Sequence, residues 1–417
     1  MRAVLIAAYA VIAIAGCLSG WWWVVLGIVA LGVGFYVVWL AESRRAAFGV
    51  KQVLVLAVLL RVLMLPMPPG LSGDVYRYLW DGAVQVEGEN PFREKPERET
   101  RWHGTALYPQ VSSEMYYSVY PPVSQFCFRL VAMIGNPMDH PLAASYLMKL
   151  SCALAELLGL VLLVRSLAPS PRVILYAWNP LVILECWGQV HSESLAIGLL
   201  ALAWLAWKKA YPVGSCLLVT MAGLVKIYPL LFLPLLVKRG LPVRTVLAMM
   251  LVSISATILL WLPFWSVEAW EHFCQSIDLY VRSFEFNAGP YYALKTVYGL
   301  GVGQVLRYCA LAASIVLWVI CFQTRRDWLV GAAWIMVIHI FFATTLHPWY
   351  FLLPTYLAVA SGRQMMWIWW WLCGSSILTY VQYPFPNAYW PLVIGIWLVA
   401  LVLFVVEWGL HRSRTAR

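Results

Sequence analysis

The chain has 417 residues, of which 62% are hydrophobic and 12% are charged, and its formal net charge is +10. Because a soluble globular protein carries about 25% charged residues, this composition excludes an ordinary soluble domain and indicates a membrane protein. The basic residues form short clusters between apolar runs and no single patch, which argues against nucleic acid as a partner. The nine cysteines show neither paired nor zinc-ligand spacing, so we expect neither a disulfide framework nor a metal site.

Apolar runs that could cross a bilayer recur along the whole chain. We therefore expect an all-α polytopic membrane protein in which residues 1–417 form one transmembrane domain of about 12–14 helices. The first run is expected to be a membrane helix rather than a signal peptide, because further spans follow at once. Prolines at 229, 234, 348 and 354 predict broken or kinked helices. The expected spans cover residues 2–19, 21–41, 50–66, 141–165, 172–188, 191–209, 212–226, 228–237, 243–265, 303–323, 327–346, 349–361, 364–381 and 389–410.

Two long polar segments interrupt these spans, at residues 67–140 and 266–302. With the N-terminus in the cytoplasm, the positive-inside rule places the basic clusters in the cytoplasm and both long loops outside. This topology requires that segment 119–136 does not cross the membrane. Its Tyr120-Pro121-Pro122 start and its central Arg129 predict an interfacial or re-entrant helix.

The first polar loop is the most informative part of the chain, since residues 71–118 hold eight of the nineteen carboxylates. The pattern predicts a helix over 74–86 at the outer surface, with Asp74, Arg77, Tyr78, Asp81 and Gln85 on one face. Asp74 and Asp81 are separated by about 10 Å along the helix, which is too far for a shared metal ion. Arg77 could pair with either acid, so a salt-bridged surface helix is the alternative. An acid that follows a span so closely is a candidate functional residue, and we predict this role for Asp74.

A second group of polar residues falls near the outer ends of later spans. An outer cavity lined by Lys226, His191 and His347, to which Lys295 could add, would suit a phosphate, because lysine supplies a point charge and histidine a hydrogen-bond donor. The alternatives are a snorkelling lysine and histidines that cap helix ends. The full set of expected substrate-binding residues is Arg77, Asp81, Tyr120, Glu185, His191, Lys226, Tyr228, Lys295 and His347.

Lys149 and Glu156 lie seven residues apart on one face of the span 141–165, so we expect them to pair inside the bundle. Broken helices and a buried ion pair would also suit a transporter or lipid-carrier flippase, which is the alternative function. A scaffolding membrane subunit is a further alternative. A transporter, however, does not need a long outer loop rich in acids. The chain contains no P-loop, dinucleotide fingerprint or nucleophile elbow.

An ordered set of motifs over about residues 60–355 resembles the GT-C superfamily of membrane glycosyltransferases. Within that superfamily the chain looks like the bacterial polyprenyl-phosphate-mannose-type mannosyltransferases. The family's paired Asp-x-Asp is absent, so nothing argues for a metal. The motifs are Gly73-Asp74-Val75-Tyr76-Arg77-Tyr78-Leu79-Trp80-Asp81-Gly82, Gly88-Glu89-Asn90-Pro91-Phe92, Tyr120-Pro121-Pro122, Trp178-Asn179-Pro180 with Glu185 and His191, Leu224-Val225-Lys226-Ile227-Tyr228-Pro229 and Leu346-His347-Pro348-Trp349-Tyr350.

The resemblance implies an inverting glycosyltransferase in which Asp74 is the catalytic base. Its donor would be a polyprenyl-phosphate sugar, with mannose as the sugar that the family branch suggests, and no cofactor is implied. The acceptor would be a lipid-linked or cell-envelope glycan on the outer, periplasmic face of a bacterial inner membrane. Expected partners are therefore membrane lipids, the lipid-linked donor and the glycan acceptor.

Overall fold

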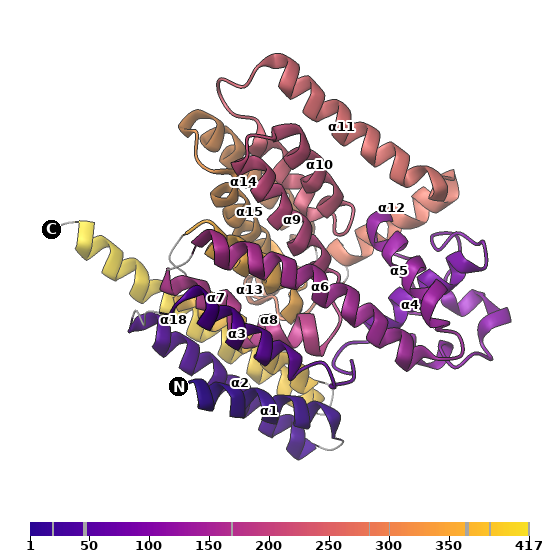
Figure 1. The fold of residues 1–417 in the computed structure, drawn as a ribbon, viewed down its shortest axis with the longest axis horizontal. Coiled ribbons are helices and arrows are strands. Elements are labelled where there is room, and N and C mark those ends of the chain that lie inside the picture. Colours follow the sequence, from indigo (N-terminus) through magenta and orange to yellow (C-terminus); the bar gives the residue numbers. More distant parts are fainter. Residues whose placement is uncertain are drawn as a thin grey trace.

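The computed structural model describes residues 1–18, 21–44, 48–167, 170–282, 284–299, 301–362, 367–382 and 385–415. Within these ranges the regular elements are all helical, and the one isolated β-bridge joins Phe286 to Thr345. The expected all-α class is confirmed (Figure 1).

The bundle consists of long helices joined by short or irregular ones. The long and medium helices are α1 (Arg2–Cys17), α2 (Trp21–Ser43), α3 (Val50–Val62), α6 (Pro141–Leu167), α9 (Glu193–Lys208), α10 (Pro212–Gly223), α11 (Val243–Trp261), α14 (Val302–Thr324), α15 (Trp328–Phe342), α16 (Leu352–Ala360), α17 (Trp367–Ser376) and α18 (Tyr389–Thr415). The short elements are η4 (Pro171–Val173), α7 (Ile174–Ala177), α8 (Pro180–Ile183), the π-helical η5 (Leu184–Gly188), η6 (Tyr228–Leu236), η7 (Leu262–Phe264), η8 (Pro348–Phe351), η9 (Ile377–Gln382) and η10 (Pro386–Ala388).

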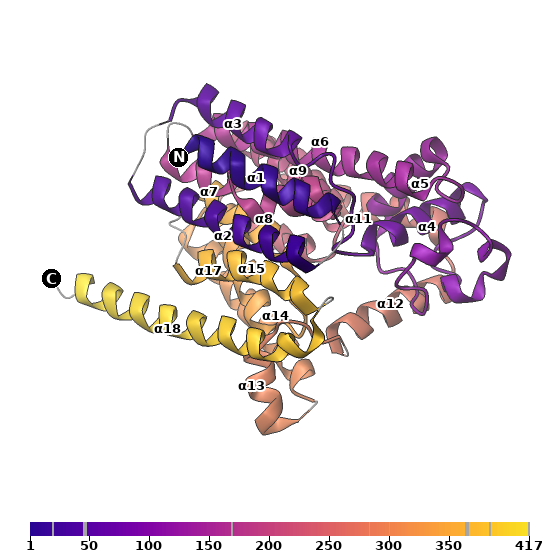
Figure 2. The same ribbon diagram turned by 90° about the horizontal axis from the view of Figure 1, so that it is seen from below.

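The two long polar segments fold into helices of their own. They contain α4 (Asp74–Val86), η1 (Pro96–Arg98), η2 (Thr100–Trp102), η3 (Tyr108–Gln110), α5 (Pro122–Gly135), α12 (Val267–Arg282) and α13 (Gly289–Tyr298). In Figure 2, α4, α5 and α12 extend from one end of the bundle, and the C-terminus lies at the opposite end. The first polar loop and α12 therefore lie at one end of the molecule, whereas α13 projects below the bundle in this view.

Five described helices are long and apolar enough to cross a membrane, and the pair Pro171–Gly188 and Glu193–Lys208, bent by 116°, would make a sixth. A multi-pass membrane protein is thus confirmed. Fewer helices qualify than the 12–14 expected, because α1, α10 and α15 are shorter apolar helices and η6 contains Pro234. The five long spans are Leu26–Ser43, Pro141–Leu167, Val243–Phe264, Val302–Thr324 and Pro386–Gly409.

Helix α4 has the predicted bounds but not the predicted environment. Residues 77–85 are buried, and the polar face packs into the protein instead of lying at the surface. A Cβ on Gly82 would lie 2.2 Å from the Phe128 carbonyl oxygen, so glycine permits the close approach of α4 to α5. Tyr78 stacks on Phe128 with the ring centroids 4.6 Å apart. The surface position expected for this helix is wrong because the protein itself supplies partners for its polar side chains.

The expected Lys149–Glu156 pair is also wrong. Glu156 accepts two hydrogen bonds from Arg61, at 2.8 and 2.7 Å, and a third from the Trp187 indole at 2.9 Å. Lys149 instead donates to the carbonyl of Met67, just after α3. The planar guanidinium of Arg61 satisfies both carboxylate oxygens at once, which one ammonium cannot do as well. The pair that favoured a transporter is therefore absent, and the Arg61–Glu156 contact ties α3 to α6.

Candidate functional site

A cavity of about 420 Å³ lies at the end of the bundle that carries the first polar loop. Its walls come from the start of α4, from α12, α14 and α15, and from the segments 119–121, 226–228 and 343–350. Apolar side chains in its wall include Ile277, Met336 and Ile340. The wall also presents ionisable and aromatic side chains, namely Asp74, Tyr120, Lys226, Tyr228, Tyr280, Arg307, His339, Phe342, His347, Trp349 and Tyr350.

Asp74 is the first residue of α4 and lines this cavity. Its backbone amide donates to the Ser72 hydroxyl at 3.2 Å, and a carboxylate is favoured at a helix N-terminus. A Cβ on Gly73 would lie 2.2 Å from the Ser112 hydroxyl, so the glycine lets residue 112 approach the turn. The Asp74 side chain is 29% exposed. Burial raises the pKa of this carboxyl above its ordinary value, while His191, Lys226 and Ser72 oppose the rise.

His191 lies behind Asp74 and faces two carboxyl groups. Its Nδ1 is 3.9 Å from Asp74 Oδ2, and its Nε2 is 3.0 Å from Glu185 Oε2. The Tyr380 hydroxyl donates to Glu185 Oε1 at 3.0 Å. Glu185 lies in η5, and His191 lies in the turn between η5 and α9, where the chain bends sharply. The structure therefore places the predicted His191 beside Asp74 and the predicted Glu185 beside His191.

Lys226 lies at the predicted break, between α10 and η6. Its ammonium is 3.0 Å from Glu193 Oε1 and 5.5 Å from the centroid of the Tyr120 ring. Tyr120 lies near Lys226 because α5 docks against the neighbouring residue, where the Ser124 hydroxyl donates to the Val225 carbonyl at 2.9 Å. Glu193 is fully buried. Sequence analysis missed it, although an acid that opens an apolar helix directly after His191 is a usable signal.

His347 belongs to a stack of aromatic rings in the cavity wall. Its ring is 4.4 Å from that of Trp349, which in turn is 4.1 Å from His191. Phe286 covers the other side of His347 at 4.4 Å. The Phe286 amide donates to Thr344 O at 3.1 Å, and this pairing fixes the segment before His347. Burial lowers the pKa of His347 to about 3, so the imidazole is neutral near pH 7.

Arg307 is the second cation that lines the cavity, and sequence analysis missed it. It lies near the start of α14, inside an expected span, where an arginine looks like an interfacial anchor. Its guanidinium is 3.9 Å from Asp278 Oδ1, and its side chain is 37% exposed. The group is therefore held loosely enough to reach an anion in the cavity.

Five of the predicted substrate-binding residues do not line the cavity. Glu185 and His191 lie behind Asp74, so the predicted place of His191 in the cavity wall is not found, and Arg77, Asp81 and Lys295 lie elsewhere. Arg77 and Asp81 bond to each other at 2.8 Å, and neither lines the cavity. Arg77 Nη1 donates to Ser113 O and Tyr116 O at 3.0 and 2.7 Å. Both side chains thus hold the polar loop against α4.

Lys295 pairs with Glu285 at 2.5 Å within the second polar segment, and it too is absent from the cavity wall. Among the described residues, no group of three or more His, Cys, Asp or Glu side chains is placed to bind a metal ion.

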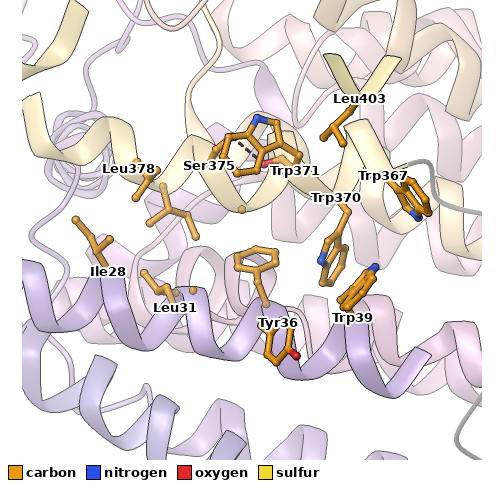
Figure 3. A pocket seen from close by; sticks show the side chains of 14 residues that line it. Ile28, Leu31, Tyr36, Trp39, Trp367, Trp370, Trp371, Ser375, Leu378 and Leu403 are labelled. Carbon is orange, nitrogen blue, oxygen red and sulfur yellow. Dashed lines mark hydrogen bonds between the residues drawn. The ribbon is translucent and has the colours of Figure 1, made fainter. Parts of the chain in front are cut away.

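A second cavity, of about 560 Å³, lies between α2, α17 and α18. Figure 3 shows Ile28, Leu31 and Trp39 of α2 on one side of it and Trp370, Trp371 and Leu378 on the other. Ser375 lies in the wall and donates its hydroxyl to the Trp371 carbonyl at 2.7 Å. This apolar space has no acid, base or cation in its lining, so the chemistry belongs to the first cavity.

Comparison with known families decides the class of protein. Residues 3–240, more than half of the chain, match the model described as "Alpha-(1->6)-mannopyranosyltransferase, N-terminal domain". The chain belongs to this alpha-(1->6)-mannopyranosyltransferase family. It is also similar to alpha-(1->6)-mannopyranosyltransferase A of Mycobacterium tuberculosis, with 27% identity over 371 residues that cover 79% of this chain and 69% of that protein.

Membership of the alpha-(1->6)-mannopyranosyltransferase family confirms the resemblance to membrane mannosyltransferases found in the sequence. The matched residues include Asp74, His191 and Lys226. Arg307 and His347 lie beyond the matched part of the mannopyranosyltransferase model, although they line the same cavity.

Proposed function

We propose that the chain is an inverting mannosyltransferase that moves mannose from a polyprenyl phosphate to a hydroxyl of a lipid-linked or cell-envelope glycan. The observation that carries this proposal is one cavity lined by a carboxylate, Asp74, and by two cations, Lys226 and Arg307. A glycosyl transfer from a lipid phosphate needs a base for the acceptor and positive charge for the departing phosphate. The cavity contains both.

In the proposed reaction, Asp74 takes the proton of the acceptor hydroxyl as that oxygen attacks the anomeric carbon. The bond between the anomeric carbon and the phosphate oxygen breaks, and the phosphate leaves with the electron pair. Arg307 and Lys226 would stabilise the charge that develops on it. A single displacement inverts the anomeric centre, so an alpha product requires a beta-linked donor.

The apolar side chains in the cavity wall support a lipid-linked donor. Ile277, Met336 and Ile340 could cover the first isoprene units while the phosphate meets the cations. Tyr120 and Tyr350 provide aromatic surface on which a sugar ring could lie.

The proposed location of this chemistry is the outer face of a bacterial inner membrane. Several basic residues lie in turns away from the polar loops. Arg172 donates to Gly362 O at 2.8 Å, and Lys238 donates to Arg326 O. The positive-inside rule assigns such turns to the cytoplasm and the Asp74 cavity to the opposite side.

The test is transfer by the purified protein in nanodiscs to an alpha-(1→6)-linked mannose oligosaccharide. Three donors are compared, namely beta-linked and alpha-linked mannosyl phosphates of a short polyprenol, and GDP-mannose. We expect product only from the beta-linked lipid donor, with a new alpha-(1→6) linkage by NMR. Transfer from GDP-mannose alone would contradict the proposed donor, and a beta-linked product would contradict inversion.

A further inference from the structure

We propose that His191 and Glu185 are a positioning pair for Asp74, in which a protonated Glu185 fixes the His191 tautomer and His191 donates a hydrogen bond to the Asp74 carboxylate. This inference rests on the proposed function, because it requires Asp74 to act as a base. It assigns two residues that need not touch either substrate.

The geometry of the imidazole carries the inference. Its two nitrogens face two different carboxyl groups, with Nδ1 3.9 Å from Asp74 Oδ2 and Nε2 3.0 Å from Glu185 Oε2. His191 is 1% exposed and Glu185 is fully buried. An imidazole buried between two carboxyl groups transmits the protonation state of the inner one to the outer one.

The ring and its backbone are both fixed. The His191 ring stacks on Trp349 with an interplanar angle of 13° and a centroid distance of 4.1 Å. Two residues earlier, the Gln189 side-chain oxygen accepts from the amides of Gly70 and Leu71, at 3.0 and 2.9 Å. The segment 189–191 therefore holds the chain that leads into Asp74 and places the His191 ring beside its carboxylate.

The charges around Glu185 indicate whether this carboxyl group is protonated and which His191 nitrogen carries the ring proton. Among the described residues, Glu185 has His191 as an ion-pair partner and neither lysine nor arginine. An ionised carboxylate buried without a cation is strongly unfavourable, so Glu185 is the neutral acid. The Tyr380 hydroxyl donates to its oxygens at 3.0 and 3.1 Å. The acid proton then lies on the side of His191 Nε2, and Nδ1 carries the ring proton toward Asp74.

The remaining groups that face His191 agree with a neutral ring that donates. They are Asp74 of α4, Glu193 of α9, Lys226 before η6 and His347 before η8. Lys226 opposes a positive imidazole, and its partner is Glu193 at 3.0 Å. Within the part of the chain that the structure describes, both His191 nitrogens are buried without a hydrogen-bond partner, because the Asp74 contact is too long at 3.9 Å and the 3.0 Å Glu185 contact lacks hydrogen-bond geometry. Catalytic hydrogen bonds are often long or poorly aligned before substrate binds and tighten in the substrate complex. During transfer the pair keeps its own protons while Asp74 gains and then releases one.

The test compares Glu185→Gln with Glu185→Leu. The amide of glutamine can still donate to Nε2, so kcat of Glu185→Gln should stay within about threefold of the parent enzyme. Leucine removes the donor, so kcat of Glu185→Leu should fall about 10- to 100-fold, with little change in KM for either substrate. Without the His191 hydrogen bond, the Asp74 carboxylate is less stable, so the acid limb of the kcat profile should move up by about one pH unit.

A second variant keeps the proposal falsifiable if Glu185→Leu does not fold. His191→Phe retains a ring for the Trp349 stack but removes both nitrogens, and its acid limb should move in the same direction. An acid limb that stays at the parent pH in whichever of these two variants folds would overturn the positioning role. Equal kcat values for the glutamine and leucine variants would overturn it as well.

The base assignment is tested separately by Asp74→Asn. An inactive Asp74→Asn enzyme with an unshifted Glu185→Leu profile defeats the pair but leaves the proposed function standing. An active Asp74→Asn enzyme defeats the proposed function first.

Discussion

The Lys226 ammonium lies 3.0 Å from an oxygen of Glu193, a carboxylate that is fully buried. The lysine predicted to hold a phosphate therefore already has an anionic partner inside the protein. This relationship changes what a substitution at Lys226 measures, since removing the cation leaves a buried charge unpaired.

We predict that Lys226→Met destabilises the folded protein as well as weakening donor binding. Breaking a buried ion pair costs roughly 3–5 kcal/mol, and the 17% exposure of the Lys226 side chain places the expected loss at the lower end. Thermal unfolding in nanodiscs measures it. The double variant Lys226→Met/Glu193→Leu should recover much of that stability, and a double variant no more stable than Lys226→Met would contradict the pairing.

Arg307 gives a cleaner test of the phosphate site because Asp278 holds it only at 3.9 Å. We predict that Arg307→Met weakens binding of the lipid-phosphate donor by about 10- to 100-fold, the cost of one hydrogen bond to a charged group. Stability should change little. Lys209→Gln, which removes an exposed cation just after the end of α9, is the matched control. If both variants bind the donor as the parent does, Arg307 is not part of the site.

Asp81 should behave differently from Asp74, although both lie on α4. Asp81 bonds to Arg77 at 2.8 Å and accepts from Gln125 at 3.0 Å inside the protein. Asp81→Asn should therefore lower stability by about 2–3 kcal/mol while the folded fraction keeps a kcat near that of the parent. Active-site titration alongside thermal unfolding separates the two effects. A normal unfolding temperature together with a lost kcat would place Asp81 in the chemistry instead.

The pH dependence of turnover follows from the environment of Asp74. Burial raises the pKa of this carboxyl above its ordinary value, which is about 3.9 for an aspartate. A base acts only when ionised, so activity should be full above the raised pKa and fall as the pH drops through it. The acid limb of kcat/KM should consequently lie above pH 3.9. An enzyme that stays fully active down to pH 4 would show that no such group titrates.

Local patterns predicted the elements of the site better than its contacts. The helix 74–86 forms with the predicted bounds, and Asp74, Tyr120, Lys226, Tyr228 and His347 meet at one cavity. Helical periodicity and proline breaks are encoded within a few residues, so they can be recognised in the sequence alone.

The pairing of charged side chains with one another could not be predicted in the same way. Arg61 meets Glu156 across 95 residues, and Glu193 at the start of α9 meets Lys226 after α10. These pairs depend on how the helices pack, which periodicity does not specify. The burial of α4 was missed for the same reason, because its polar partners come from residues 113–125. Arg307 was overlooked because an arginine near the start of a span has an ordinary interfacial explanation.

The most direct test of the central claim is the turnover of Asp74→Asn. Asparagine is nearly isosteric with aspartate but cannot accept the acceptor's proton. The account predicts that the variant folds, inserts into membranes and binds the donor as the parent does, while kcat for mannosyl transfer falls by about 10²-fold or more. An Asp74→Asn enzyme that transfers mannose at the parent rate would contradict the role of Asp74 as the base, and with it the proposed mechanism.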